Sequence, residues 1–356
     1  MITAKSHTDT DVGFAPIEKW LGRQLFKSIG PAPIRFVLRD GTEISPAGSS
    51  PVGTVFIHDN RTLAKLIIDP EMAFGEAYAD GRVHVDGDFV RLLEVVYQSM
   101  GAAPEGRYER LTSKLLNWWQ ANTLHGSRNN IHRHYDLGND CYKLWLDHAA
   151  EGLSSRVEFI KDDYRNIPGS FDAFVSVGKL EYVDPRRFAD FGEVIYRAVG
   201  DTGRGLLHFI GRSHSGNFGR WIRKRIFPGA HAPSLAEAMN ILQPLHYSVL
   251  DVENLRPHYA RTLEHWLDRF EASSPQVIEM YDGWFQRAWR LYLAGSIAGF
   301  RAGTLQLFQI SFAGSKRQSS SWTRAPLYTR PPHKETGLPI VISTWDNPEP
   351  CRQRSD

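Results

Sequence analysis

Two polar side chains stand where two expected strands end. Glu181 follows the apolar stretch 171–177, and His208 lies near the end of the stretch 205–210. The carboxyl ends of parallel strands meet at one edge of an open α/β sheet, and ligands bind at that edge. The pair therefore indicates a ligand site, whereas either residue alone is more often a satisfied polar group of a loop.

The segment 220–227 alternates positive charge with large apolar side chains. Its cations are Arg220, Arg223, Lys224 and Arg225, and its apolar members are Trp221, Ile222, Ile226 and Phe227. A Lys or Arg near an anionic leaflet contributes about 1 kcal/mol, and aromatic rings settle at the membrane interface. One interpretation is a lid that meets phospholipid head groups. The other is an amphipathic surface helix with a solvated basic face.

Several other kinds of site are not indicated. The chain has no P-loop, no zinc signature and no nucleophile elbow. A nucleotide loop must follow a strand and open a helix, but Gly203-Arg204-Gly205 precedes a strand and is expected to be a turn. His132 and His134 have no further ligand at a suitable spacing, so we expect no metal.

Length and composition set broad limits. The 356 residues suffice for two domains, and a net charge of +2 does not argue for a surface that binds nucleic acid. Cys141 and Cys351 cannot build a disulfide framework, which favours a reducing cytoplasm. Residues 1–13 lack the pattern of a signal peptide, and the apolar run 291–300 is about half the ~20 residues of a spanning helix. Any membrane contact is therefore expected to be peripheral.

Hydrophobic periodicity predicts two kinds of organisation. The first ~100 residues form a small α+β unit, with strands at 34–38 and 52–58 and helices at 17–27, 61–68 and 89–97, and a linking helix follows at 107–122. From residue 157, strands at 157–160, 171–177, 205–210, 246–252 and 305–312 alternate with helices at 187–197, 235–242, 261–270 and 276–299. Such alternation predicts an α/β domain with a largely parallel sheet, followed by a disordered tail.

Five sequence strings, in the right order, resemble those of the cyclopropane fatty acid synthase family and the mycolic acid cyclopropane synthases. They lie at 69–88 (DPEMAFGEAYADG and VDGD), 134–147 (HYDLGND), 221–229 (WIR and IFPG), 254–266 (NLRPHYA) and 289–302 (WRLYLAG and GFRA). The resemblance spans residues 16–328. It implies a Rossmann-like S-adenosylmethionine methyltransferase domain at 148–328, an α+β lipid-associated domain at 1–105, a linking helix and entrance motif at 106–147, and a tail at 329–356.

The resemblance also implies a reaction and its site. The family transfers a methyl group from S-adenosylmethionine to the cis double bond of an acyl chain in a membrane phospholipid, and proton loss then closes a cyclopropane. An alkene is a poor nucleophile, so the site must be dry and tightly positioned. Bicarbonate is the base, and the residues that would hold it are Glu181, His208, Ile210 and Tyr259. The residues that would contact the cofactor are Tyr135, Asp163, Tyr164 and Gly178, with Tyr164 beside the adenine or, alternatively, in the core.

One part of the family pattern is missing after Asp147. Residues 148–150 run directly into 151–159, which resembles the lead-in to the family's third strand. The lost piece includes a βαβ unit of about 30 residues or more, with the glycine loop and the acidic residue that holds the ribose. The cradle cysteine is lost too; Cys141 does not replace it, and Ser296 stands where a further cysteine is usual. We therefore expect a truncated domain whose fourth strand has an unpaired edge.

Three functions stay open. The first is cyclopropane formation, and the second is methyl branching of the same acyl chains, which would use nearly the same residues. The third is a remnant without catalysis that binds lipid or a partner subunit, and the absent glycine loop favours it. We expect a cytoplasmic protein, peripheral on the inner face of the membrane, for which a homodimer is one option.

Overall fold

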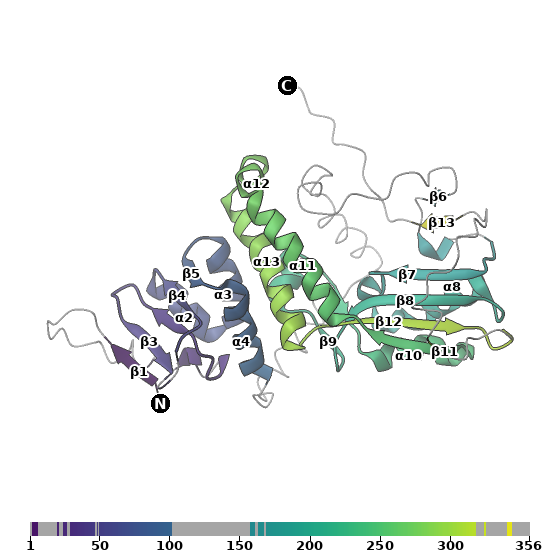
Figure 1. The fold of residues 1–356 in the computed structure, drawn as a ribbon, viewed down its shortest axis with the longest axis horizontal. Coiled ribbons are helices and arrows are strands. Elements are labelled where there is room, and N and C mark those ends of the chain that lie inside the picture. Colours follow the sequence, from purple (N-terminus) through teal and green to yellow (C-terminus); the bar gives the residue numbers. More distant parts are fainter. Residues whose placement is uncertain are drawn as a thin grey trace, which may run out of the picture.

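The computed structural model describes residues 2–5, 20, 24–26, 29–46, 48, 50–101, 157–160, 163–166, 169–317, 324 and 340–343. Within them the chain forms an N-terminal unit, a group of long helices and a twisted sheet, in that order across Figure 1. The expected linking helix 107–122, the entrance motif, Tyr135 and both cysteines lie outside the described residues.

The N-terminal unit is a sheet flanked by helices, as expected. Its strands are β1 (Ile2–Lys5), β2 (Arg35–Val37), β3 (Glu43–Pro46), β4 (Gly53–Ile57) and β5 (Val83–Gly87), in the order β1-β3-β2-β4-β5. Its helices are α2 (Asn60–Ile68), α3 (Pro70–Ala79) and α4 (Phe89–Gly101). Asp69 caps α3 by accepting a hydrogen bond from the Met72 N–H, and Pro70 suits the first turn because its missing N–H would have no partner there.

The main sheet has the order β11-β12-β8-β7. Its strands are β7 (Ala173–Val177), β8 (Arg204–Gly211), β11 (Ser248–Asn254) and β12 (Gln306–Ala313). The expectation of a largely parallel sheet is confirmed for three of these four strands, because β7, β8 and β11 run in one direction, whereas β12 is antiparallel to both β8 and β11. The reason is the excursion between β11 and β12. Three helices leave the carboxyl end of β11 and return to the same edge, where the Leu255 N–H donates to the Leu307 carbonyl, so β12 runs back.

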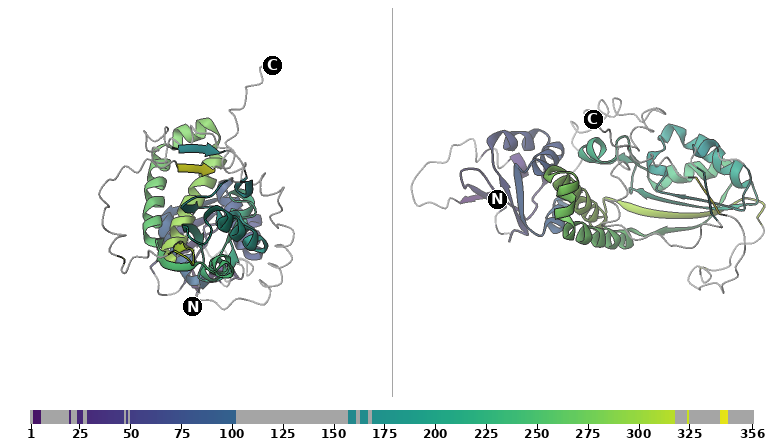
Figure 2. Two further views of the ribbon diagram at one scale, coloured as in Figure 1. Left: turned by 90° about the vertical axis from the view of Figure 1, so that its right-hand side faces the viewer. Right: turned by 90° about the horizontal axis from the view of Figure 1, so that it is seen from above.

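Those three helices are α11 (Arg256–Ala272), α12 (Ser274–Met280) and α13 (Gly283–Ala302). The sequence leaves open whether the helical stretch 276–299 is one long helix or a broken one, and it is broken at Tyr281 and Asp282, where Asp282 caps α13 by accepting from the Phe285 N–H. Helices α11 and α13 pack against each other, and α13 also packs against α3 and α4, so that both share one hydrophobic core with the N-terminal unit. Figures 1 and 2 show these helices between the N-terminal unit and the main sheet.

A second core lies under one face of the main sheet. Helices α8 (Phe188–Val199) and α10 (Leu235–Leu242) cover this face, and their fully buried side chains include Phe191, Ile195 and Ile241. The opposite face of β7 is bare, since the side chains of Val175 and Val177 are 64% and 66% exposed. Among the described strands, β7 pairs with β8 alone and stands at the end of the sheet. Strand β7 is the fourth strand of the family pattern, whose unpaired edge the sequence predicts.

The remaining elements are short. They are β6 (Val157–Ile160), β9 (Gly216–Asn217), β10 (His231–Ala232), β13 (Ile340–Ser343), α9 (Arg220–Arg225) and the 3-10 turns η1 (Tyr164–Asn166), η2 (Leu180–Tyr182), η3 (Pro185–Arg187) and η4 (Gln243–Leu245). Strand β6 has the expected bounds and pairs in parallel with β13. Strand β13 lies in the stretch expected to be disordered, and the sequence pattern did not predict it.

Candidate active site

The carboxyl ends of β7 and β8 bring four predicted residues together. Strand β7 is followed by Gly178, whose φ of 64° favours glycine and whose N–H donates to the His208 carbonyl at 2.9 Å. The chain then turns through η2, which buries Glu181 to 5% exposure. Its Oε1 accepts a hydrogen bond from the Ile210 N–H at 2.6 Å. Gly178, Glu181, His208 and Ile210 therefore lie at one edge of the sheet, as predicted.

Glu181 has an unusual environment for a carboxyl group. Burial raises its pKa to about 7, and the hydrogen bond from the Ile210 N–H opposes that rise. Its second oxygen, Oε2, is buried and has no hydrogen-bond partner among the described residues. A buried polar atom without a partner is costly, so such an atom often marks a place where a ligand binds. A carboxyl with a pKa near neutrality can also exchange a proton at physiological pH.

Tyr259, the remaining residue of the predicted cradle, stands in the first turn of α11. The Tyr259 N–H donates to the Leu255 carbonyl, and the Leu255 N–H in turn donates to Leu307, which pairs with Ile210 across β12 and β8. Its ring packs edge-on against Phe300 with centroids 5.1 Å apart. The side chains of Ile210 and Tyr259 pack on the same core. The start of α11 thus follows β11 directly, and β12 lies between β11 and the strand that carries His208.

Asp163 and Tyr164 stand after β6, and both make defined contacts. The Arg165 guanidinium donates to the Asp163 carboxylate at 2.7 Å and holds its pKa below the usual range. The Tyr164 ring packs edge-on against Phe191 at 5.6 Å. The Lys179 ammonium lies 4.6 Å from the centroid of the Tyr164 ring, and burial lowers the pKa of Lys179 to about 7. Lys179 was not predicted as a site residue, although a lysine in the turn between an expected strand and Glu181 was a visible signal.

These residues fit part of a nucleoside cofactor. A side-chain atom added to Gly178 would meet nothing within 4 Å, so there is open space at the end of β7. Tyr164 offers an aromatic surface beside that strand end, although the Lys179 ammonium lies over its ring. The glycine loop and the acidic ribose ligand have no counterpart in the sequence. The described residues therefore fit the adenine end of S-adenosylmethionine, and none of them fits its ribose.

Helix α9, predicted as a membrane lid, contacts the N-terminal unit instead. Arg220 donates to Asp69 at 2.7 Å, and Arg225 donates to both oxygens of Glu76 at 2.8 and 2.7 Å. The ammonium of Lys224 lies 3.7 Å from Glu76.

The segment 220–227 also makes buried and apolar contacts between these ion pairs. Trp221 is 3% exposed and stacks so closely on Gly75 that an added Cβ would lie 2.4 Å from its ring. Arg223 is buried, and burial lowers its pKa. Phe227 packs edge-on against Tyr292 at 5.3 Å. The sequence did carry a signal for this interface, because Asp69 and Glu76 are seven residues apart and so share one face of α3.

Two other features are absent from the part of the chain that the structure describes. None of its helices is long and apolar enough to cross a membrane. No group of three or more His, Cys, Asp or Glu side chains within it could hold a metal ion.

Comparison with known families identifies two segments. Residues 148–310 match the family described as "Mycolic acid cyclopropane synthetase", and residues 21–105 match a domain of unknown function, DUF7884. Among solved structures, the mycolic acid cyclopropane synthase CmaA1 with SAH and CTAB is similar over 52% of this chain and 97% of that one, at 18% identity and a TM-score of 0.45. MmaA2 from Mycobacterium tuberculosis gives the same identity and TM-score over 52% and 98%.

Three curated relatives differ in how much they share. A "Probable fatty acid methyltransferase" from Pseudomonas putida is 24% identical over 385 residues, covering 83% of this chain and 96% of the relative. The "Cyclopropane-fatty-acyl-phospholipid synthase" of Escherichia coli K12 is 35% identical over 46% of this chain and 42% of the relative. "Tuberculostearic acid methyltransferase UfaA1" of Mycobacterium tuberculosis is 36% identical over 45% and 39%. The chain thus spans less than half the length of these last two relatives.

The alignment with the Pseudomonas relative has one further feature. It runs over 385 positions, but 83% of a 356-residue chain is about 295 residues, so about 90 positions have no residue of this chain opposite them.

Proposed function

Residues 148–310 match the mycolic acid cyclopropane synthetase family, and from this match we propose that the chain methylates unsaturated acyl chains of membrane phospholipids. The product would be a cyclopropane ring across the former cis double bond. The observation that carries the proposal is the retained cradle at the ends of β7 and β8. Glu181 is buried there with one oxygen bound to the Ile210 N–H and the other without a partner among the described residues.

The chemistry assigns definite tasks to these residues. S-adenosylmethionine, when bound, supplies an electrophilic methyl group, which adds to the double bond and leaves a carbocation on the acyl chain. Loss of a proton from the added methyl group closes the ring, so the site must receive that proton away from water. Bicarbonate would be held by Glu181, His208, Ile210 and Tyr259. Glu181 Oε2 fits this ion because a carboxylate oxygen can accept a hydrogen bond from its hydroxyl group.

The surrounding residues exclude water and set the protonation state. Phe227 packs edge-on against Tyr182, the neighbour of Glu181, and against Tyr292. Such rings provide a dry wall for hydrocarbon and a favourable surface for a passing cation. Because burial raises the pKa of Glu181 to about 7, the carboxyl can take up or release a proton near neutral pH.

The proposal is tested by titrating the purified chain with S-adenosylmethionine in a calorimeter, and then by incubating both with vesicles that contain unsaturated phosphatidylglycerol. We expect binding on the ~1 μM–1 mM scale usual for enzyme substrates, and lipid products one CH₂ heavier. Glu181→Gln should leave cofactor binding unchanged and lower methyl transfer by about 10²–10⁴-fold. No binding up to millimolar concentration by folded protein would contradict the proposal. Mass spectra of the lipids separate a ring from a methyl branch.

A second candidate is a member without catalysis that binds lipid. The bare face and edge of β7 favour it, because Val175 and Val177 are exposed where the family pattern has further strands. On this alternative the chain binds vesicles but not S-adenosylmethionine, and Glu181→Gln changes neither result.

A further inference from the structure

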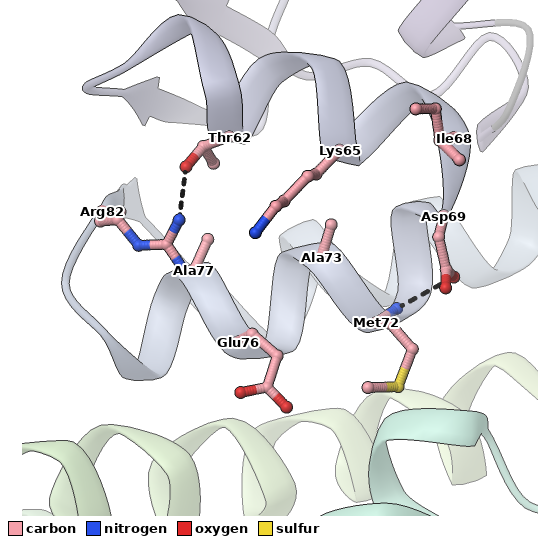
Figure 3. A pocket seen from close by; sticks show the side chains of 9 residues that line it. All are labelled: Thr62, Lys65, Ile68, Asp69, Met72, Ala73, Glu76, Ala77 and Arg82. Carbon is pink, nitrogen blue, oxygen red and sulfur yellow. Dashed lines mark hydrogen bonds between the residues drawn. The ribbon is translucent and has the colours of Figure 1, made fainter.

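A groove of about 250 Å³ lies outside the candidate active site, between α2 and α3 of the N-terminal unit. Figure 3 shows the side chains that line it, which are Thr62, Lys65, Ile68, Asp69, Met72, Ala73, Glu76, Ala77 and Arg82. The two helices run side by side and are joined by the turn at Asp69. The groove is therefore built from one continuous stretch of chain plus Arg82 from the turn before β5.

The charges of the groove do not cancel. Both of its acids are paired with α9, Asp69 with Arg220 and Glu76 with Arg225. Arg82 is tied to Asp80 and also donates to the Thr62 hydroxyl at 3.0 Å. The Lys65 ammonium, by contrast, has no ion pair or hydrogen bond among the described residues, and in Figure 3 it reaches from α2 across the groove toward α3. The groove thus presents one uncompensated positive charge.

The apolar part of the groove lies on one side of that charge. Ala73 and Met72 line it on α3, and Ile68 stands at the end of α2 with 83% of its surface exposed. Arg82 lies at the other end, and the Lys65 ammonium lies in the middle of the groove, between Arg82 and Ala73. A ligand that matches both halves has an anionic group at one end and hydrocarbon at the other.

We propose that this groove binds the anionic head group of a membrane phospholipid, with its phosphate at Lys65 and its glycerol and first methylenes along Ala73 and Met72. Ile68 then enters the acyl layer of the leaflet. The membrane contact lies here and not on α9, because the α9 cations are already paired with Asp69 and Glu76. The lipid nature of the ligand rests on the proposed function, whereas the charge and shape of the groove do not.

The test is co-sedimentation of the full chain with vesicles of phosphatidylcholine that contain phosphatidylglycerol at about a third of the lipid, and with vesicles of phosphatidylcholine alone. Lys65→Glu should weaken binding to the anionic vesicles about tenfold or more, because each basic residue near an anionic surface counts and this change reverses one. Ile68→Ser should weaken it severalfold. The matched control is Arg61→Glu, which makes the same charge change on the same helix at a residue that does not line the groove.

The possible outcomes distinguish a lipid site from diffuse charge attraction and from a site for free phosphate. If Lys65→Glu and Arg61→Glu weakened vesicle binding equally, the attraction would be diffuse and the proposal would be overturned. Vesicle binding by Lys65→Glu at the wild-type level would also overturn it. Displacement of the chain from vesicles by millimolar inorganic phosphate, with Ile68→Ser binding as wild type does, would mean that the groove takes free phosphate, which also overturns it. S-adenosylmethionine binding by Lys65→Glu, measured in parallel, shows that the variant is folded. If the wild-type chain bound vesicles but not S-adenosylmethionine, the methyl-transfer proposal alone would be refuted.

Discussion

Replacing Glu181 by Gln should change how the stability of the chain depends on pH. The folded chain keeps the Glu181 proton up to a pKa of about 7, whereas the unfolded chain releases it near 4.5. A raised pKa means that the wild-type chain loses stability as pH rises from 4.5 to 7. Glutamine does not titrate, so the variant lacks this loss. Because all other titrating groups are common to both chains, they cancel in the difference.

The size of the effect follows from the two pKa values. Each unit of pKa shift corresponds to about 1.36 kcal/mol, and between pH 5 and pH 8 the linkage amounts to about 2.5 kcal/mol. The variant also places an amide N–H₂ where Oε2 has no described partner, which costs about 1–3 kcal/mol at both pH values. The stability of the variant relative to wild type should therefore improve by about 2.5 kcal/mol from pH 5 to pH 8, whatever its starting value.

Urea unfolding followed by tryptophan fluorescence at pH 5, 6, 7 and 8 measures this difference directly. The matched control is Glu193→Gln, an exposed carboxyl on α8. We expect its stability relative to wild type to stay constant within ~0.5 kcal/mol, as is usual for surface substitutions. If the stability of Glu181→Gln relative to wild type were as independent of pH as that of this control, Glu181 would not be a buried carboxyl with a raised pKa. The interpretation of the cradle would then be wrong.

Three further changes test the interface, the cofactor edge and the bare strand. Gly75→Val should lower the free energy of unfolding by about 1–3 kcal/mol, because its Cβ would lie 2.4 Å from the Trp221 ring. In urea unfolding, adding Trp221→Ala to the same chain should restore part of that loss. Lys179→Met should strengthen S-adenosylmethionine binding about tenfold at pH 6, because the wild-type ammonium is charged there and repels the cationic cofactor. Calorimetry at pH 8 should show equal affinities for the variant and the wild type. Val177→Lys places a charge on the exposed edge strand β7, so it should reduce concentration-dependent self-association in sedimentation velocity. The urea midpoint should stay the same. Unchanged self-association would exclude the β7 edge as the contact between copies.

Local patterns in the sequence were sufficient to predict most of the elements. The bounds of β6 and α10 are as expected, and β7, β8 and α8 differ by one or two residues. These elements follow from hydrophobic periodicity and from neighbouring glycine and proline residues, which act over a few positions. Strands β1, β3, β5 and β13 and helix α3 were not predicted, although none is shorter than the predicted strand β2, and β13 in particular is defined by its pairing with β6.

The candidate cradle was predictable for a related reason. Glu181 and His208 follow or end strands that are recognisable on their own, and parallel strands bring their carboxyl ends to one edge. The sequence could not show the state of Glu181, because its burial and the hydrogen bond from the Ile210 N–H depend on a strand 29 positions further along the chain. Likewise, the contact of Lys179 with Tyr164 requires the turn after β7 to fold back toward η1.

The sequence by itself determined the resemblance to the cyclopropane synthases, the α/β class and the candidate site at the ends of two strands, because these depend on residue types at fixed spacings. Only the tertiary structure decided the role of the basic segment 220–227. Its alternating charges suit a membrane surface or a protein surface equally well, and the choice depends on what faces it. Asp69 and Glu76, about 150 residues earlier, face it in the folded chain and pair with Arg220 and Arg225. Those pairs leave Lys65 as the cation with no described partner beside the α2–α3 groove, a result that no local pattern contains because charge balance belongs to the assembled surface.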